Sequence, residues 1–301
     1  MKLKNIPFYI AHPDVAYTRL RIKLSDKYAI EQQWKDKMSY PLNFKQPRGF
    51  MEKLNWLKLY DHNPQYAIMA DKVLAKIWVA ERIGEEHIIP TIGVYDTATD
   101  IDLAKLPDKF VLKCNHDSSG AILCKDKSSF DLKTVADELN KHISKNYYWY
   151  EYEWAYRNIK RKILAEEFID SNLVNPHELN MGDSLMTYKF MCFNGIPRIM
   201  YITVKNDDIF EDYFDMDYKP LDIQRRYRHS GINIPKPKTW EEMKEVARRL
   251  SEGIPFLRVD LYEIAGKVKF SECTFYDWGG YCAFDEEWEY KIGEWITLPK
   301  K

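Results

Sequence analysis

The sequence has no hydrophobic run that could cross a membrane and no surplus of charge of one sign. None of its 301 residues lie in an uninterrupted apolar stretch of the ~18 residues that a spanning helix needs. The 45 basic and 46 acidic residues leave a formal charge of −1, which argues against a protein that coats nucleic acid. The N-terminal apolar stretch is short and is broken by Pro7, His12 and Pro13, unlike a signal peptide. We therefore expect a cytoplasmic protein with no nucleic-acid partner and no transmembrane segment.

Cysteine is also scarce, and its spacing excludes the usual cysteine-based sites. The five cysteines are odd in number and none form a CxxC pair, so a zinc site or a disulfide framework is not expected. They are typical of a reduced cytoplasmic protein. Low-complexity tracts, internal repeats and long Gly/Ser linkers are absent as well. The length then indicates about two domains with a sizeable core.

The patterns that are present differ between the two halves of the chain. Helices are predicted at 51–60, 71–84, 131–145 and 239–253 from apolar residues at helical spacing. In the last of these, Thr239 and Glu242 have the spacing of a capping box. Short strands are predicted at 109–113, 121–124, 163–169, 187–193, 197–204, 256–263 and 267–273. Early helices followed by late hairpins predict an α+β fold with at least two lobes.

The last hairpin could carry chemistry. If its strands pair symmetrically about Ala265, Arg258 lies opposite Glu272 and Asp260 lies opposite Phe270, all on one face. Two carboxylates beside a cation and an aromatic ring suit a Mg²⁺–phosphate site, because Mg²⁺ prefers oxygen ligands. The alternative is a solvated face with a cross-strand Arg–Glu pair.

Two other segments have weaker signals. Lys113 ends a strand and is followed by CNHDSSG, a turn whose backbone N–H groups could hold phosphate, although it lacks the Walker A pattern. A plain hairpin loop is the alternative. The strand ILAEEFID at 163–170 could present backbone groups to adenine, or it could be a partly exposed edge strand.

The order of these segments is more specific than any one of them. The segments are DK (71–72), FVLKCNHDSSG (110–120), ILAEEFID (163–170), TYKFMCFNG (187–195), LRVDLYE (257–263) and SECTFYDWGG (271–280). In this order they resemble the ATP-grasp superfamily, and more closely its teichuronopeptide-biosynthesis-like branch of polysaccharide biosynthesis proteins. The resemblance extends from about Phe50 to the end of the chain.

The resemblance implies a fold, a domain organisation and cofactors. The fold implied is an ATP-grasp fold, α+β in class, with the nucleotide bound between two lobes. The parts implied are a mainly helical region at 1–90, a lobe with the phosphate-binding loop at 91–165, and a lobe with the adenine hinge and the metal carboxylates at 166–301. ATP and Mg²⁺ are the expected cofactors.

The resemblance also implies roles for individual residues. The expected nucleotide-binding residues are Lys72, Lys113, Ser118, Ser119, Gly120, Glu166, Glu167, Phe168, Ile169 and Lys189, to which the shared hairpin face adds Phe270. The expected metal ligands are Asp260, Glu272 and Thr274, the last standing where many relatives have asparagine. Arg258 and Lys113 are expected to act on the transferred phosphoryl group.

This sequence differs at three places from the motifs of the teichuronopeptide-biosynthesis-like branch. The loop reads HDSSG where relatives more often have HGSG, Thr187 replaces the aspartate of a DYK motif, and Lys76 replaces a usual arginine. None of them removes a metal carboxylate or Lys113, so an active enzyme is expected.

The function implied is that of an ATP-dependent carboxylate–amine ligase. It would form an amide through an acyl phosphate, joining an amino acid or amine to a uronic acid of a surface polysaccharide precursor, with transient contact to membrane-bound glycan machinery. The alternatives are a glycosyltransferase, for which Asp215-Met216-Asp217 supplies a DxD pattern, and a non-catalytic nucleotide-binding scaffold.

An aromatic run at 147–156, YYWYEYEWAY, has no role in this scheme. We predict a helix that packs between lobes, with Tyr148, Tyr152 and Tyr156 on one stripe. The alternative is a platform on which sugar rings stack.

Overall fold

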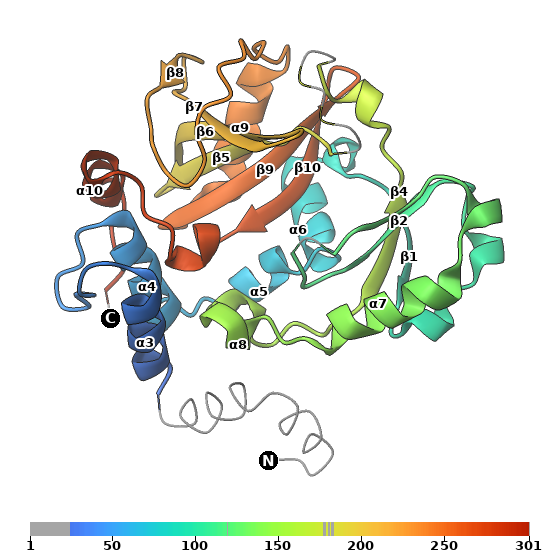
Figure 1. The fold of residues 1–301 in the computed structure, drawn as a ribbon, viewed down its shortest axis with the longest axis horizontal. Helices are drawn as coiled ribbons and strands as arrows, with labels where there is room; N and C mark the ends of the chain where they lie inside the picture. Colours follow the sequence, from blue (N-terminus) through green and yellow to red (C-terminus); the bar gives the residue numbers. More distant parts are fainter. Residues whose placement is uncertain (1–24, 119, 177–178, 180, 182–183, 301) are drawn as a thin grey trace.

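A computed structural model of the protein describes residues 25–300, apart from residues 119, 177, 178, 180, 182 and 183. Two antiparallel sheets, one of four strands and one of six, are combined with helices from both halves of the chain (Figure 1). This confirms the predicted α+β class. Among the described residues, no helix has the length and apolar character needed to cross a membrane.

The smaller sheet has the strand order β1–β4–β2–β3. Its strands are β1 (Thr91–Tyr95), β2 (Phe110–Cys114), β3 (Ile122–Cys124) and β4 (Ile163–Glu167). Alternate residues of β2, Phe110 and Leu112, are fully buried in a core that helix α7 (Leu132–Ser144) covers. The predicted lobe boundary between residues 165 and 166 falls inside β4.

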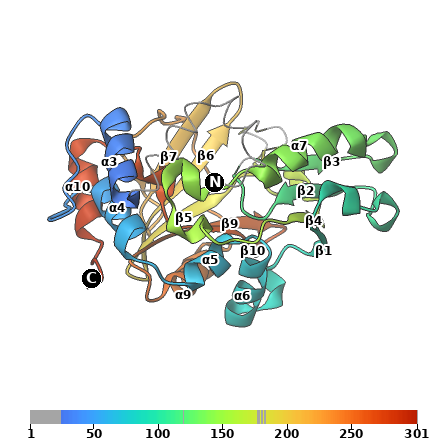
Figure 2. The same cartoon turned by 90° about the horizontal axis from the view of Figure 1, so that it is seen from below.

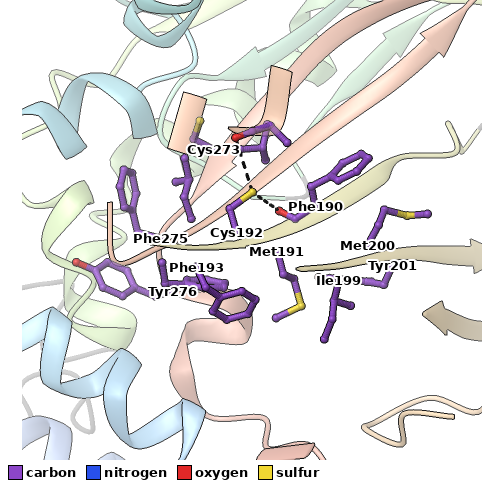
Figure 3. Close-up of a cluster of buried hydrophobic side chains, with 14 of the residues drawn as sticks. Phe190, Met191, Cys192, Phe193, Ile199, Met200, Tyr201, Cys273, Phe275 and Tyr276 are labelled. Carbon is purple, nitrogen blue, oxygen red and sulfur yellow. Dashed lines mark hydrogen bonds between the residues drawn. The ribbon is translucent and has the colours of Figure 1, made fainter. Parts of the chain in front are cut away.

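The larger sheet has the strand order β10–β9–β5–β6–β7–β8. Its strands are β5 (Tyr188–Phe193), β6 (Ile196–Lys205), β7 (Ile209–Phe214), β8 (Pro220–Leu221), β9 (Phe256–Ile264) and β10 (Lys267–Thr274). Helix α9 (Trp240–Ser251) covers one face, where the rings of Trp240 and Phe190 lie 5.2 Å apart. Figure 3 shows this core around Cys192, whose thiol contacts the carbonyl of Phe190 at 3.7 Å. All five cysteines are free.

Beside the larger sheet, α3 (Asp26–Lys37), α4 (Phe50–Tyr60) and α10 (Glu286–Glu294) pack together, whereas α5 (Gln65–Ala70) and α6 (Leu74–Ile83) pack on each other and on β10 (Figure 2). Helix α10 approaches α4 closely at Gly293, where a Cβ atom would lie 2.1 Å from the carbonyl oxygen of Arg48. The ring of Phe50 lies 4.9 Å from that of Phe256, so these helices share the core of the six-stranded sheet.

Helix α9 begins differently from the prediction. Thr239 is its N-cap residue, but the Thr239 side chain makes no capping hydrogen bond. Its hydroxyl instead donates to Glu263 of β9 at 2.6 Å, and its backbone N–H donates to the same carboxylate. The predicted capping box with Glu242 is therefore wrong, because a tertiary partner replaces the local one.

The aromatic run does not form one continuous helix. Helix α8 covers only Tyr148–Glu151, since Tyr152 has a left-handed backbone (φ 57°) that ends it, and a 3₁₀ turn, η6 (Trp154–Tyr156), follows. The single stripe of three tyrosines is therefore wrong. Tyr148 and Tyr152 are nevertheless buried in the larger core, as packing requires, whereas Tyr156 is half-buried.

Candidate functional site

The hairpin of β9 and β10 pairs in a register that differs from the prediction. Ala265 and Gly266 both have positive φ (50° and 75°) and form a two-residue turn, so the pairing is not symmetrical about Ala265. A bulge between Phe270 and Glu272 then shifts the register again. The extra residue in β10 changes which side chains of the two strands share a face.

The shifted register still brings the charged residues together. Asp260 lies opposite Glu272, and Arg258 lies opposite Thr274, so both predicted cross-strand pairs are wrong. Phe270 pairs with a core leucine and is only 2% exposed, which places it on the apolar face of the hairpin. The predicted shared face therefore keeps Arg258, Asp260 and Glu272 but loses the aromatic ring.

Arg258 is the centre of this cluster. Its guanidinium donates to both carboxylate oxygens of Asp260 at 2.7 Å and to Glu272 at 3.1 Å. It also donates to Asp277 at 2.7 Å and to the hydroxyl of Tyr201 at 3.2 Å. Three carboxylates therefore share one arginine. Asp277 was not among the predicted site residues, although it follows Thr274 closely in the SECTFYDWGG segment.

Asp277 is held in a tight turn, η9 (Asp277–Gly280), in which the three residues after it all have positive φ. Its second carboxylate oxygen accepts a 2.6 Å hydrogen bond from Arg225, and neither side chain is exposed. Burial opposes the charged carboxylate, but Arg225 and Arg258 outweigh it and lower the pKa of Asp277. Asp277 is therefore ionised and fixes the position of Arg258.

Asp260 and Glu272 have the chemistry of magnesium ligands. Burial raises the pKa of Asp260 even though Arg258 acts against the rise. Burial would also raise the pKa of Glu272, but Lys72 and Arg258 lower it. Among the described residues no group of three or more His, Cys, Asp or Glu could enclose a metal. Two carboxylates suit Mg²⁺ when phosphate oxygens and water complete its shell, so the residues fit the expected cofactors.

Three lysines, from the smaller sheet, from α6 and from the segment just before α6, bind carboxylates of the site. The Lys72 ammonium lies 3.6 Å from Glu272, and both Lys76 of α6 and Lys113 of β2 bind the buried carboxylate of Glu166 on β4. Although burial acts against its charge, Lys113 and Lys76 lower the pKa of Glu166. Lys76 thus keeps the positive charge of the arginine that it replaces.

The start of α6 is tied to the predicted phosphate-binding loop. One carboxylate oxygen of Asp71 accepts from the backbone N–H of Val73 at 2.9 Å, and the other accepts from the side chain of Asn115 at 2.8 Å. The backbone N–H of Lys72 donates to the carbonyl of Asn115 at 2.9 Å. These contacts position Lys72 beside the loop.

The loop itself is organised around Asp117, which is 4% exposed. Its carboxylate accepts from the hydroxyl of Tyr147, which also contacts the carbonyl of Ser118 at 3.4 Å. A Cβ atom at Gly120 would lie 2.6 Å from Asp117, so a larger residue does not fit there without a shift. Ser119 lies outside the described residues.

A cavity of about 280 Å³ lies beside β2 and β4. It is lined by Ile89, Val111, Lys113, Ala121, Leu123, Glu166, Glu167, Phe168, Ile169, Ser171, Leu185 and Tyr262. Lys113 and the predicted hinge of Glu166 to Ile169 thus share one cavity, and Phe270 does not line it. Tyr262 was not predicted, because it depends on the true register of the hairpin, where it contacts Ser271 at 3.0 Å.

Lys189 lies in the larger sheet, opposite Asp260 on β9. Its ammonium donates to the hydroxyl of Thr203 at 2.7 Å and lies 5.0 Å from the centre of the Tyr201 ring. Burial, followed by the charge of Arg258, lowers the pKa of Lys189. Lys189 therefore belongs to the carboxylate cluster rather than to the cavity.

The DxD pattern at 215–217 forms the turn between β7 and β8. Asp215 accepts hydrogen bonds from the backbone N–H groups of Asp217 and Lys219, at 2.9 and 2.8 Å. Asp217 pairs with Lys219 at 3.5 Å. These carboxylates stabilise a surface turn and make no contact with the Arg258 cluster.

Comparison with solved structures gives low overall similarity. The ATP-grasp ligase PsnB complexed with minimal precursor is 9% identical (TM-score 0.41), and the match covers 74% of this chain and 60% of that chain. A RimK domain ATP-grasp protein from Sphaerobacter thermophilus is 11% identical (TM-score 0.41), with coverages of 77% and 69%. The D-alanine–D-alanine ligase from Helicobacter pylori is 14% identical (TM-score 0.38), with coverages of 76% and 62%. The chain thus spans less than two thirds of PsnB and of that ligase.

Comparison with protein families is more informative. A search of curated proteins gives no match. The TupA-like ATP-grasp family, however, matches residues 52–297, a range that includes both sheets, the cavity and the Arg258 cluster. The chain therefore belongs to the TupA-like ATP-grasp family, which confirms the fold that the sequence predicts.

Proposed function

We propose that this protein is an ATP-dependent carboxylate–amine ligase. The observation that carries the proposal is the 3.6 Å contact between Lys72 and Glu272. It joins the segment just before α6 to the carboxylates of the larger sheet, and the neighbouring lysines Lys76 and Lys113 belong to α6 and to the smaller sheet. A nucleoside triphosphate with a divalent cation needs both kinds of group at once, and membership of an ATP-grasp family supports this assignment.

The cavity suits the adenine ring. Its walls include the aliphatic side chains of Val111, Ile169 and Leu185. Strand β4 ends at Glu167, so the backbone groups of Phe168 and Ile169 lie beyond the strand and are available to the edge of the base. Lys113 lines the same cavity and would contact the phosphates that lead towards Glu272.

The charged cluster suits phosphoryl transfer. Asp260 and Glu272 would hold Mg²⁺, which when bound neutralises charge on the phosphate oxygens. Arg258 is held in place by Asp277 and would stabilise the transferred phosphoryl group. Attack of a substrate carboxylate on the γ-phosphate gives an acyl phosphate and ADP. Attack of an amine on that intermediate gives an amide and phosphate.

The substrate class is proposed from the family. The resemblance to teichuronopeptide-biosynthesis proteins and the match to the TupA-like family support a uronic acid of a surface polysaccharide precursor as the carboxylate. An amino acid or other amine would be the second substrate. The enzyme would act in the cytoplasm, with transient contact to membrane-bound glycan machinery.

Hydroxylamine tests the reaction class directly, since it converts an acyl phosphate into a stable hydroxamate. The protein is incubated with ATP, Mg²⁺, hydroxylamine and either glucuronic or galacturonic acid. We expect ADP and hydroxamate to form together, and both to be lost in Glu272→Gln. ADP without hydroxamate would indicate a kinase or an ATPase. Nucleotide binding without turnover would indicate a scaffold, and sugar transfer from a nucleotide sugar a glycosyltransferase.

A further inference from the structure

The segment after β8 contains three arginines within four residues, RRYR at 225–228, and the proposed reaction uses only one of them. Arg225 holds Asp277, and Arg228 pairs with Asp208 at the surface at 2.8 Å. Arg226 is exposed and, within the described part of the chain, has neither an ion pair nor a side-chain hydrogen bond. An arginine that the fold leaves unpaired is available to an anionic group of a ligand.

Two aromatic rings hold Arg226 in place. The carbon atom of its guanidinium lies 5.3 Å from the centre of the Trp278 ring and 5.6 Å from that of the Tyr227 ring. The two rings lie 5.7 Å apart and are inclined by 50° to each other. A guanidinium that packs on aromatic rings through its flat face keeps its N–H groups free to bind a carboxylate. Both aromatic residues are half-buried, so part of each remains accessible.

The position of Trp278 depends on the tight turn η9. Its backbone has a left-handed conformation (φ 51°), which a bulky residue rarely adopts. The residue before it, Asp277, is buried and bonds Arg258, whereas the Trp278 ring lies against Arg226 and Tyr227. One turn therefore serves both the reaction centre and the aromatic pair.

Two pairs of residues lie next to each other along this contact. In the inner pair, Asp277 accepts from Arg225 through one carboxylate oxygen and from Arg258 through the other. In the outer pair, Arg226 packs on Trp278, and each of these residues follows a member of the inner pair in the sequence. Since consecutive Cα atoms are about 3.8 Å apart, the outer pair lies close to the arginine of phosphoryl transfer.

The inner pair also leaves one donor without a partner. The Arg225 side chain is not exposed, and it donates through Nε to the carbonyl of Cys282 at 2.9 Å and through Nη1 to Asp277. Its Nη2 is buried and has no hydrogen-bond partner in the described part of the chain. The guanidinium carbon of Arg225 lies 5.6 Å from the centre of the Trp278 ring. Buried donors are normally satisfied, so this one calls for an oxygen acceptor that the chain itself does not supply.

We propose that Arg226, Tyr227 and Trp278 form a second sugar site, which binds the neighbouring uronic acid of the acceptor glycan, a role that rests on the ligase function proposed above. The carboxylate of one uronic acid reacts at Arg258. The carboxylate of the sugar beside it pairs with Arg226, and the ring of that sugar packs against Trp278. The preferred acceptor is thus an oligouronide rather than a free uronic acid.

The chemistry of the three side chains suits an acidic sugar. A pyranose ring has apolar C–H groups on its faces and hydroxyls around its edge, so it packs on an aromatic ring and keeps its edge in water. Arginine binds a carboxylate through two parallel N–H groups, which lysine cannot do. The base of the nucleotide is not the ligand here, because the cavity assigned to adenine lies beside β2 and β4 and is lined by none of these three residues.

The length of the acceptor tests the proposal. Galacturonic acid and trigalacturonic acid are compared as carboxylate substrates in the hydroxylamine assay described above. We expect the wild type to prefer the trimer, with a lower KM and a higher kcat/KM than for the monomer. In Arg226→Gln this preference, the ratio of the two kcat/KM values, should fall by about 10-fold through a higher KM for the trimer, because a charge-assisted hydrogen bond is lost.

Two further variants sharpen the comparison. Trp278→Leu removes the ring on which the sugar packs, so the preference for the trimer should fall by about 5-fold. Arg228→Gln is the matched control, because it makes the same change two residues away in an exposed arginine that already pairs with Asp208, and it should keep the wild-type preference. Equal kcat/KM for monomer and trimer in the wild type would overturn the proposal. An equal loss with both acceptors in Arg226→Gln would overturn it too, because the residue would then have only a structural role.

Calorimetric binding of trigalacturonic acid without ATP separates the second sugar site from the ligase function. We expect Arg226→Gln to bind the trimer about 10-fold more weakly than the wild type, Arg228→Gln to bind it equally well, and neutral maltotriose to bind the wild type more weakly than the trimer does. If the wild type forms no hydroxamate, the ligase function fails, and calorimetry still decides. Weaker binding by Arg226→Gln then supports the site, whereas equal binding, or no binding by the wild type, contradicts it.

Discussion

At the scale of single residues, Arg258 decides how the charges of the site are distributed. Its three carboxylate partners differ in burial, since Asp277 is not exposed at all whereas the Glu272 side chain is 35% exposed. A fully buried ion pair is costly to break, because a charge would be left without a partner. Asp277 is therefore the permanent partner, and Glu272 is the partner most accessible to a cation, with Asp260, whose side chain is 3% exposed, opposite it on β9.

Removing the charge of either carboxylate should therefore stop turnover. Glu272→Gln and Asp260→Asn keep shape but lose a metal ligand, so we expect ADP formation to fall by about 100-fold or more. Glu272→Gln should keep wild-type stability, whereas Asp260→Asn should lose some, because it breaks a two-point hydrogen bond with Arg258. Asp217→Asn, in the exposed DxD turn, is the matched control and should keep full activity. Wild-type turnover in both site variants would show that the metal assignment is wrong.

At the scale of elements, patterns located several helices and strands, missed others such as α10, β1 and β7, and did not show how the elements meet. Apolar periodicity placed α4 and β5 within a residue or so of their observed bounds, because each depends on one buried face. The register of the last hairpin depends on the left-handed backbone of Ala265 and on a bulge, and neither leaves a clear mark in the sequence. The prediction of a capping box for α9 was wrong for a similar reason, because Glu263, the residue that binds the Thr239 hydroxyl, is distant in the sequence.

The packing of α10 on α4 gives a prediction at this scale. Glu289 of α10 is 4% exposed and accepts from the backbone N–H groups of Met51 at 2.6 Å and Phe284 at 3.3 Å. Burial raises its pKa from 4.5 to about 7, so between these values the folded protein binds more protons than the unfolded chain. The free energy of unfolding should then fall as the pH rises through this interval.

Glu289→Gln tests this because glutamine does not titrate and its single side-chain oxygen can still accept the hydrogen bond from Met51, while the bond from Phe284 to the other carboxylate oxygen is lost. Urea unfolding of the two proteins, measured across this pH interval, should give a steeper decline for the wild type than for the variant. If the two pH profiles run parallel, the Glu289 carboxyl is not the group responsible.

At the scale of the whole molecule, the two sheets have separate apolar cores, and polar contacts join the larger sheet to segments that precede the smaller one. The smaller core surrounds Phe110 and Leu112, while the larger one includes α3, α4 and the aromatic run. Besides Lys72 and Glu272, the side chain of Lys269 on β10 bonds the carbonyl of Glu86 at 2.6 Å. The order of motifs predicted the residues on both sides of this junction. It did not predict Arg225 or Asp277, because their role depends on loops that only the folded chain brings together.

A nucleotide bound at this junction should stabilise the whole molecule. ATP with Mg²⁺ at 100 times its dissociation constant should add about 2.7 kcal/mol to the free energy of unfolding, provided that the unfolded chain does not bind it. Lys113→Ala should reduce the rise in thermal midpoint, because the ammonium that Glu166 now holds would no longer reach the phosphates. Lys105→Ala removes an equal charge from an exposed residue that precedes β2, and it should leave the rise unchanged. The assignment of the nucleotide to this junction fails if ATP with Mg²⁺ produces no rise, or if the two lysine variants respond alike.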